Sequence, residues 1–330
     1  MCLFEIYNWI YTPFRANMYT NKRKKHTLKG GKTMINQYFG IEIELTGLTR
    51  QKAAKIIAKY FNSTSEHIGG NYDEYHANDT ENRTWKVVSD ASIEPQKKVR
   101  EEIQTADNLY KVEVVSPKLK YKDIETLQEL IRLLRKGGAI TNPTCGIHVH
   151  IDGANHSPRS LKNLVNLIAS KEDLLYKSLQ VDMQRLRYCK KVNEDLIKTI
   201  NKKKPKTLEK LADIWYAGYG SESRHRHYHN SRYHGLNLHS IFDKGTVEFR
   251  IFNSTTHAGK VKAYIQFCLA VSYQAIIQKS ASAKRTFTDN EKYTFRCWML
   301  RLGLIGPEFE TCRHHFLENL SGNSAWRNAA

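Results

Sequence analysis

The sequence has no apolar run close to the ~18 residues that a membrane-spanning helix requires. Its six cysteines are scattered along 330 residues without a C-x-x-C pair, which argues against a zinc ribbon and a dense disulfide scaffold. The first residues lack the basic region that opens a signal peptide, since the basic cluster follows the apolar residues. These absences predict a cytoplasmic protein with no membrane span and with reduced cysteines.

Acidic residues are few relative to basic ones: 33 Asp and Glu accompany 52 Lys and Arg, a net charge of +19. Such an excess favours polyanionic partners and decides nothing about the fold. Residues 1–36 contain the basic run 22–25. We expect them to be a disordered basic extension, an upstream start before Met34, or a basic arm for an anionic polymer. Without residues 1–33, which hold seven basic residues and one acid, the net charge is still +13.

Polar residues two apart, flanked by aliphatic or aromatic residues, recur in several short segments. This alternation is typical of a strand with one apolar and one polar face. The segments are Ile41–Leu45, Val112–Val114, Ile147–Ile151, Leu236–His239 and Val247–Ile251. If these strands share a sheet, one face carries Glu42, Glu44, Glu113, His148, His150, Glu248 and Arg250. Such a face is costly to assemble unless a cation and an anionic ligand lie between its charges.

The remaining pattern predicts an α+β fold, in which helices cover the apolar side of an antiparallel sheet. The predicted helices are 50–61, 123–136, 157–180, 257–279 and one or two within 288–318. Further predicted strands are 84–89, 112–115, and the pair 234–242 and 246–252, joined as a hairpin near Asp243-Lys244-Gly245. Two segments are less regular: a polar loop or hairpin end at 62–82, and a basic helical stretch at 181–215 that breaks at 202–206.

The polar face has the chemistry of a divalent-metal site. A Glu-x-Glu strand offers two hard oxygen ligands about 7 Å apart on one face. Carboxylates suit Mg²⁺ or Mn²⁺, ions that keep waters and share substrate phosphates, and a neighbouring histidine suits Mn²⁺ as well. Arg250 lies two residues after Glu248, so it should point to the same cavity and grip a phosphate or carboxylate with two hydrogen bonds. Metals beside a guanidinium indicate phosphoryl transfer.

Six segments, in this order, resemble the amidoligase family, which belongs with glutamine synthetase and glutamate–cysteine ligase among the carboxylate–amine ligases. They are FGIEIEL (39–45), WKVVSDASI (85–93), VEVVSP (112–117), CGIHVHID (145–152), RYHGLNLH (232–239) and TVEFRIFN (246–253). The resemblance covers about residues 38–275. It implies a glutamine synthetase-like domain over 37–320 whose antiparallel sheet has a concave polar catalytic face. A basic helical insertion at 181–230 and a tail at 321–330 match no family motif.

The resemblance also implies roles for single residues. The metal ligands would be Glu42, Glu44, Glu113, His148 and Glu248. His150 and Asn237 would lie near the nucleotide, and Arg250 would contact the phosphates and the transition state. Arg232 corresponds to a substrate- or phosphate-binding arginine, and Asp90 is a candidate general base. The implied reaction uses ATP and Mg²⁺ or Mn²⁺: a carboxylate takes the γ-phosphate, and the acyl phosphate then reacts with an amine to give an amide, ADP and phosphate.

Other interpretations remain open at this point. The histidines at 225, 227, 229 and 234 could bind a transition metal, contact phosphate, or belong to a loop without a ligand. The whole chain could be a metal-dependent nuclease or hydrolase, or a non-catalytic basic protein that binds nucleic acid. A ligase consumes ATP stoichiometrically, a nuclease is indifferent to it, and a binding protein turns over nothing.

Overall fold

The computed structural model describes residues 34–220, 224–226 and 228–326. The basic run 22–25 therefore lies outside the described residues, and so does His227. Of the predicted N-terminal extension only residues 34–36 are described. They form a short 3-10 helix in which Met34 is buried against the core.

The central element is an eight-stranded sheet in which all neighbouring strands are antiparallel, which confirms the predicted α+β class. Its order is β2-β3-β4-β7-β1-β8-β10-β9, so the Glu-x-Glu strand β1 lies inside the sheet. The pair β5-β6 forms a separate exposed hairpin that the sequence pattern did not predict. The strands are β1 (Phe39–Leu45), β2 (Ser65–Gly69), β3 (Glu74–Asn78), β4 (Thr84–Val88), β5 (Gln96–Val99), β6 (Glu102–Thr105), β7 (Val112–Val115), β8 (Gly146–Asp152), β9 (Leu236–Asn237) and β10 (Thr246–Asn253).

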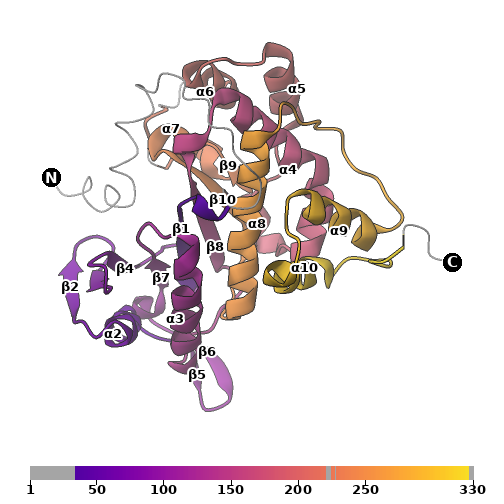
Figure 1. Ribbon diagram of the computed structural model, residues 1–330. Helices are drawn as coiled ribbons and strands as arrows, with labels where there is room; N and C mark the ends of the chain where they lie inside the picture. The colour runs from indigo at the N-terminus through magenta and orange to yellow at the C-terminus, as the bar shows by residue number, and fades with distance from the viewer. Residues whose placement is uncertain (1–33, 221–223, 227, 327–330) are drawn as a thin grey trace.

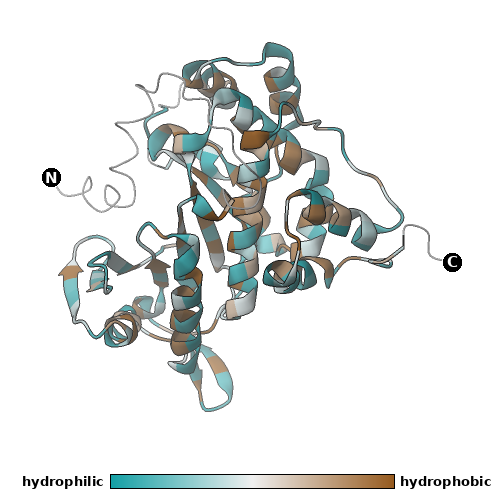
Figure 2. Cartoon of the chain, in the orientation of Figure 1, coloured by the Kyte–Doolittle hydropathy of each residue, from teal (hydrophilic) through white to brown (hydrophobic). Residues whose placement is uncertain are grey.

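Helices cover the apolar face of this sheet (Figure 1). The helix α2 packs on β3 and β4, whereas α8 packs on β8 and contacts α3, α4 and α10. Hydrophobic residues run along α8 (Figure 2), which is buried on most of its sides. The helices are α2 (Arg50–Tyr60), α3 (Ile124–Lys136), α4 (Pro158–Leu179), α5 (Glu194–Lys203), α6 (Leu208–Tyr216), α7 (His239–Asp243), α8 (Ala258–Ile277), α9 (Glu291–Arg301) and α10 (Glu310–Leu317).

Local sequence explains where the main helices begin. Thr49 precedes α2, and its side chain accepts a hydrogen bond from the main-chain N–H of Lys52. Ser157 caps α4 with its hydroxyl on the N–H of Ser160, and Pro158 occupies the first helical position, where no N–H is needed. The predicted helices at 50–61, 123–136, 157–180 and 257–279 are therefore confirmed within one or two residues.

The predicted strand 234–242 is wrong over most of its length. The strand β9 holds only Leu236 and Asn237, and α7 begins at His239. The side chain of Asn237 accepts a hydrogen bond from the N–H of His239, 2.9 Å away, and this turn starts a helix where alternation predicts a strand. The turn at Gly245, whose φ of 74° suits glycine, consequently joins α7 to β10 and not two strands of a hairpin.

The segment 181–230 contains a 3-10 helix (Met183–Arg187) followed by α5 and α6, and α5 packs against α4. The predicted break at 202–206 falls at the end of α5, where Lys204 adopts a left-handed conformation and the lysines are exposed. Among the described helices, none is long and apolar enough to span a membrane.

A candidate active site on the sheet face

Strand register brings the predicted polar side chains to one face. Across β1 and β8, Glu42 lies directly opposite His148, and across β1 and β7 Glu44 lies opposite Glu113. On the other side of β8, His150 is opposite Glu248 of β10. The alternate residues of the same strands point the other way and are buried in the core under the helices: Ile41, Ile43, Val114, Val149 and Phe249.

The functional groups are within reach of one another. Glu42 bridges both histidines: one carboxylate oxygen is 3.0 Å from His148 Nδ1 and the other is 3.2 Å from His150 Nε2. The second nitrogen of His148 is 3.6 Å from Glu44. Three overlapping groups therefore have ligand atoms within 4.8 Å of one another: Glu42, His150 and Glu248; Glu42, Glu113 and His148; and Glu44, Asp90 and Glu113.

Arg250 is fixed against Glu248. Its Nη1 donates a hydrogen bond to one oxygen of Glu248, while the amide of Asn237 donates to the other at 2.7 Å. The register of β10 against β8 shifts between Phe249 and Phe252, so Arg250 lies at a bulge. Its Nε is buried and has no hydrogen-bond partner among the described residues. An N–H donor in this position can bind an anion.

Two carboxyl groups of the face resist ionisation. Burial, together with the charge of Asp90, raises the pKa of Glu44 to about 8, although the N–H of Gly146 donates to its carboxylate. Burial and the charges of Glu42 and Asp90 raise the pKa of Glu113 well above its ordinary value. Glu44 therefore holds a proton near neutral pH when no cation is bound.

The neighbouring groups shift in the opposite direction. Burial opposes ionisation of Glu42, but His150 and the hydrogen bonds from both histidines outweigh it and hold the pKa of Glu42 well below its usual range. Burial also acts on Glu248, where Arg250 prevails and lowers the pKa of the carboxyl. Burial and then Arg250 lower the pKa of His148 to about 4, so its imidazole is neutral and can act as a metal ligand.

Asp90 belongs to this cluster, whereas the contacts of Arg232 are with two tyrosine rings. Asp90 reaches the carboxylates of Glu44 and Glu113, and one of its oxygens accepts hydrogen bonds from Ser92. The guanidinium of Arg232 lies over the rings of Tyr228 and Tyr233, at 5.1 and 5.8 Å from their centroids.

Two charged residues near the site were missed from the sequence. Arg185, in the 3-10 helix 183–187, is buried and donates hydrogen bonds to main-chain carbonyls of β10. Its guanidinium packs on Gly146, where a Cβ would come within 2.2 Å of it, so a side chain at this position would displace the guanidinium. Lys244, in the turn before β10, is partly buried, and its charge acts on Glu42 and Glu248. No alternating pattern marks either residue; only the turn around Lys244 was noted.

The histidine-rich stretch does not form a metal site in the described part of the chain. His229 is buried and stacks on His239, and its Nδ1 is 2.8 Å from the hydroxyl of Ser231. His234 instead contacts Tyr219 and a main-chain carbonyl, and His225 is exposed. None of these three histidines belongs to a group of ligand atoms that could hold a metal.

A small hollow opens beside His150. It is lined by Tyr38, Phe39, Gly40, Lys118, His150, Asp152 and Thr246. Lys118 lies 4.2 Å from the centre of the Tyr38 ring and 3.4 Å from Asp152. The hollow therefore combines an aromatic surface with a cation next to the polar face.

The structure thus combines an antiparallel sheet, covered by helices on one face, with carboxylates, imidazoles and a guanidinium on the other face. The family model described as "Putative amidoligase enzyme" matches residues 36–272. The chain belongs to this family of putative amidoligase enzymes. The family resemblance predicted from the six sequence segments is thus confirmed.

Comparison with solved structures gives a weaker likeness. A bifunctional glutathione synthetase from Pasteurella multocida superimposes with a TM-score of 0.38 and 11% sequence identity. The match covers 86% of this chain and 47% of that protein, so this chain spans about half of its length. A TM-score this low establishes neither a shared fold nor a shared substrate. No protein of curated function matches the sequence.

Proposed function

We propose that the chain is an ATP-dependent carboxylate–amine ligase with a glutamine synthetase-like catalytic sheet, which forms an amide through an acyl-phosphate intermediate. The main support is the environment of Arg250: a buried guanidinium with one unpaired N–H beside three overlapping groups of metal-ligand atoms. A phosphate group would satisfy that N–H. A divalent cation would compensate the carboxylates on the same face.

The divalent-metal ligands in this proposal are Glu42, Glu44, Glu113, His148 and Glu248, with Mg²⁺ or Mn²⁺ as the ion. Their chemistry fits these ions, because the face offers hard oxygens and a neutral imidazole. Burial first, and then neighbouring carboxylates, raise the pKa of Glu44 and Glu113, and a bound cation would favour the ionised form of both groups. When bound, the cation would neutralise phosphate oxygens of the nucleotide.

Arg250 is proposed to stabilise the negative charge that spreads over the transferring phosphoryl group. Its orientation is set before any ligand arrives, since Glu248 holds one nitrogen and Arg185 holds the main-chain carbonyl of Arg250. Arg250 is only 6% exposed, so hydrogen bonds that it donates compete little with water. A prealigned donor in a water-poor site avoids reorganisation during the reaction.

His150 and Asn237 are proposed to lie nearest the nucleotide. Asn237 also orients Glu248, because its amide already donates to that carboxylate. Arg232 is proposed to bind the anionic substrate from the rim of the site. These roles divide the polar face between nucleotide, metal and carboxylate.

In the first step, an oxygen of the substrate carboxylate bonds to the γ-phosphorus of ATP as the bond to ADP breaks. In the second, the amine nitrogen attacks the acyl carbon, phosphate leaves, and the nitrogen loses a proton. Asp90 is the proposed acceptor of that proton, since its carboxylate borders the cluster at Glu44 and Glu113. The substrates are a small-molecule or peptide carboxylate and an amine. The exposed lysines at 202–204 and 206 could also attract an anionic polymer that bears either group.

The decisive experiment crosses a set of carboxylates with a set of amines in the presence of ATP and Mg²⁺ or Mn²⁺. We expect ADP and phosphate in equal amounts, an amide product, and dependence on both substrates. Glu42→Gln is the inactive control. Nucleic-acid cleavage that is indifferent to ATP would indicate the nuclease alternative. Nucleic-acid binding without any turnover would indicate the non-catalytic alternative.

A further inference from the structure

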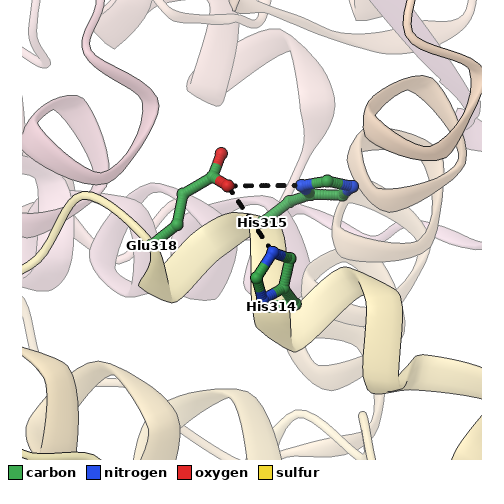
Figure 3. A group of neighbouring side chains, drawn as sticks. All are labelled: His314, His315 and Glu318. Atoms are coloured by element: carbon green, nitrogen blue, oxygen red, sulfur yellow. Dashed lines mark ion pairs between the residues drawn. The ribbon is translucent and has the colours of Figure 1, made fainter.

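A second group of ligand-type side chains lies on α10, among the helices on the opposite side of the sheet from the polar face. It consists of His314, His315 and Glu318, which follows the last helical residue (Figure 3). All three present an atom to one place, within 4.8 Å of one another. His314 Nε2 is 3.7 Å and His315 Nδ1 is 3.6 Å from the same oxygen of Glu318.

These separations are too long for hydrogen bonds and close to those between ligands of one ion. Two ligands at 2.0–2.1 Å from a tetrahedral zinc ion are about 3.4 Å apart. A hydrogen bond between nitrogen and oxygen would need about 2.7–3.2 Å. Small side-chain rotations would therefore place all three atoms around one ion, with the exposed His314 leaving a position for water.

His315 supplies an independent indication. Its side chain is only 9% exposed, and it points Nδ1 toward Glu318. That nitrogen is buried without a hydrogen-bond partner among the described residues. A buried ring nitrogen without a partner is costly, and coordination of a metal would satisfy it.

The surroundings hold the ligands in place. Lys260 of α8 is 2.8 Å from the other oxygen of Glu318, so that one carboxylate oxygen is fixed and the second faces the histidines. The ring of His257, which caps α8, packs edge-on against His315 at 5.1 Å between centroids. Burial, with His257 and Lys260 nearby, lowers the pKa of His315, which favours the neutral ring that binds metals.

We infer that His314, His315 and Glu318 form a binding site for a transition-metal ion of the Zn²⁺ type, separate from the site on the sheet face. Imidazole nitrogens with one carboxylate suit Zn²⁺ or Co²⁺ better than Mg²⁺. An ion there would fix the C-terminal turn of α10 and, through Lys260 and His257, its contact with the start of α8. The site has a structural role in this inference and does not depend on the proposed reaction.

Co²⁺ titration of the full chain tests this, because tetrahedral Co²⁺ has strong visible absorption whereas octahedral carboxylate-bound Co²⁺ does not. We expect one tetrahedral Co²⁺ per chain, displaced by Zn²⁺. Glu318→Gln should weaken it by about 10-fold or more, and His315→Gln and His314→Ala should remove it. Glu310→Gln, an exposed substitution on the same helix, is the matched control and should bind as the wild type does.

A second readout is thermal unfolding with added Zn²⁺, which should raise the Tm of the wild type and of Glu310→Gln but not that of His314→Ala. His314 is exposed, so this variant keeps the test valid if His315→Gln does not fold. Glu42→Gln should retain the tetrahedral signal. Loss of the signal in Glu42→Gln, or its persistence in both histidine variants, would overturn the inference.

Discussion

Arg185 holds the main chain of Arg250. Its Nη2 donates a hydrogen bond to the carbonyl oxygen of Arg250 at 3.0 Å, and its Nη1 donates to the carbonyl of Phe252. Both carbonyls belong to the part of β10 where the register against β8 shifts. At this bulge the hydrogen bonds between the two strands are interrupted, and the side chain of Arg185 supplies donors in their place. The direction of the Arg250 side chain thus depends on a residue outside the sheet.

Arg185→Lys should therefore misalign Arg250. Lysine keeps the charge but lacks the planar fork that reaches two carbonyls at once. We expect kcat to fall by about 10-fold with little change in KM for ATP, and unfolding to become easier by about 1–3 kcal/mol, because one buried carbonyl loses its donor. Arg187→Lys, an exposed substitution in the same short helix, is the control. An equal loss of activity in both variants, or an effect on KM alone, would contradict a positioning role.

Glu42→Gln should abolish ADP formation while the fold survives. The carboxylate of Glu42 belongs to two of the three ligand groups, and an amide is a poor substitute for a hard cation. The histidines beside it can change tautomer to accommodate the amide, so urea unfolding should shift little. Glu66→Gln, exposed on β2 of the same sheet, is the control. Turnover like that of the wild type would move the active site elsewhere.

Glu248→Gln should also abolish ADP formation, but with a loss of stability. Both oxygens of Glu248 accept hydrogen bonds, from Arg250 and from Asn237, and the amide of glutamine can accept only one of them. If the side-chain amide of Asn237 flipped to accommodate the glutamine, its oxygen would lose the hydrogen bond from the N–H of His239. We expect about 1–3 kcal/mol less unfolding free energy than in Glu42→Gln. Equal urea midpoints for the two variants would contradict this difference.

Glu44 predicts a pH effect on the metal-free protein. Its ordinary pKa of 4.5 rises to about 8 in the folded state. Between these values the folded chain keeps a proton that the unfolded chain has lost, so this group's stabilising contribution is present below pH 4.5 and disappears as the pH rises toward 8. The variant Glu44→Gln lacks this titrating carboxyl group, so its stability does not fall with pH for this reason. From pH 6.5 to 8 its unfolding free energy should increase relative to the wild type by up to about 1.4 kcal/mol per pH unit.

His148 is present in both proteins, so its titration, with a pKa of 6.5 in the unfolded chain and about 4 in the folded chain, cancels from the comparison. The measurement is urea unfolding in EDTA at several pH values, with Glu66→Gln as the exposed control. Parallel profiles for the wild type and Glu44→Gln would show that the carboxyl is already ionised. The same protonation predicts that Mg²⁺ releases protons on binding at pH 7, because a ligand carboxylate must be ionised.

The polar face of the sheet was predictable because its strands alternate apolar residues, which are buried under the helices, with polar residues on the other face. Glu42, Glu44, His148 and Glu248 all stand on such strands, and the structure brings them together. Their register was not predictable, since the pairing of Glu42 with His148 depends on contacts between segments about a hundred residues apart. Alternation also failed at β9, where the side chain of Asn237 forms a local turn that starts a helix.

Arg185 shows a different limit. Arg185 binds main-chain carbonyls, which every residue has, so the residue pattern of β10 does not indicate that an arginine binds there. Its own segment is basic and helical in sequence, and nothing distinguishes it there from the exposed Arg187. Gly146 is a local signal, because it is the first residue of the His-x-His strand β8 and leaves space for the guanidinium. The sequence does not show that the segment 183–187 packs on Gly146, so the role of this glycine becomes clear only in the structure.

Arg250→Lys separates a ligase from a protein that works through its charged surface. Negative charge spreads over the phosphoryl group in the transition state, so the planar fork of Arg250 should matter most there. We expect kcat and kcat/KM to fall together by about 100-fold or more, while ATP binding measured by calorimetry weakens less than about tenfold. The matched variant replaces the exposed lysines at 202–204 and 206 by glutamine. Their charges are solvated and screened by salt, so this variant should lose affinity for polyanions and keep its turnover of a small substrate. If the lysine variant loses all activity while Arg250→Lys keeps it, the sheet face is not where the reaction occurs and the ligase mechanism has to be abandoned.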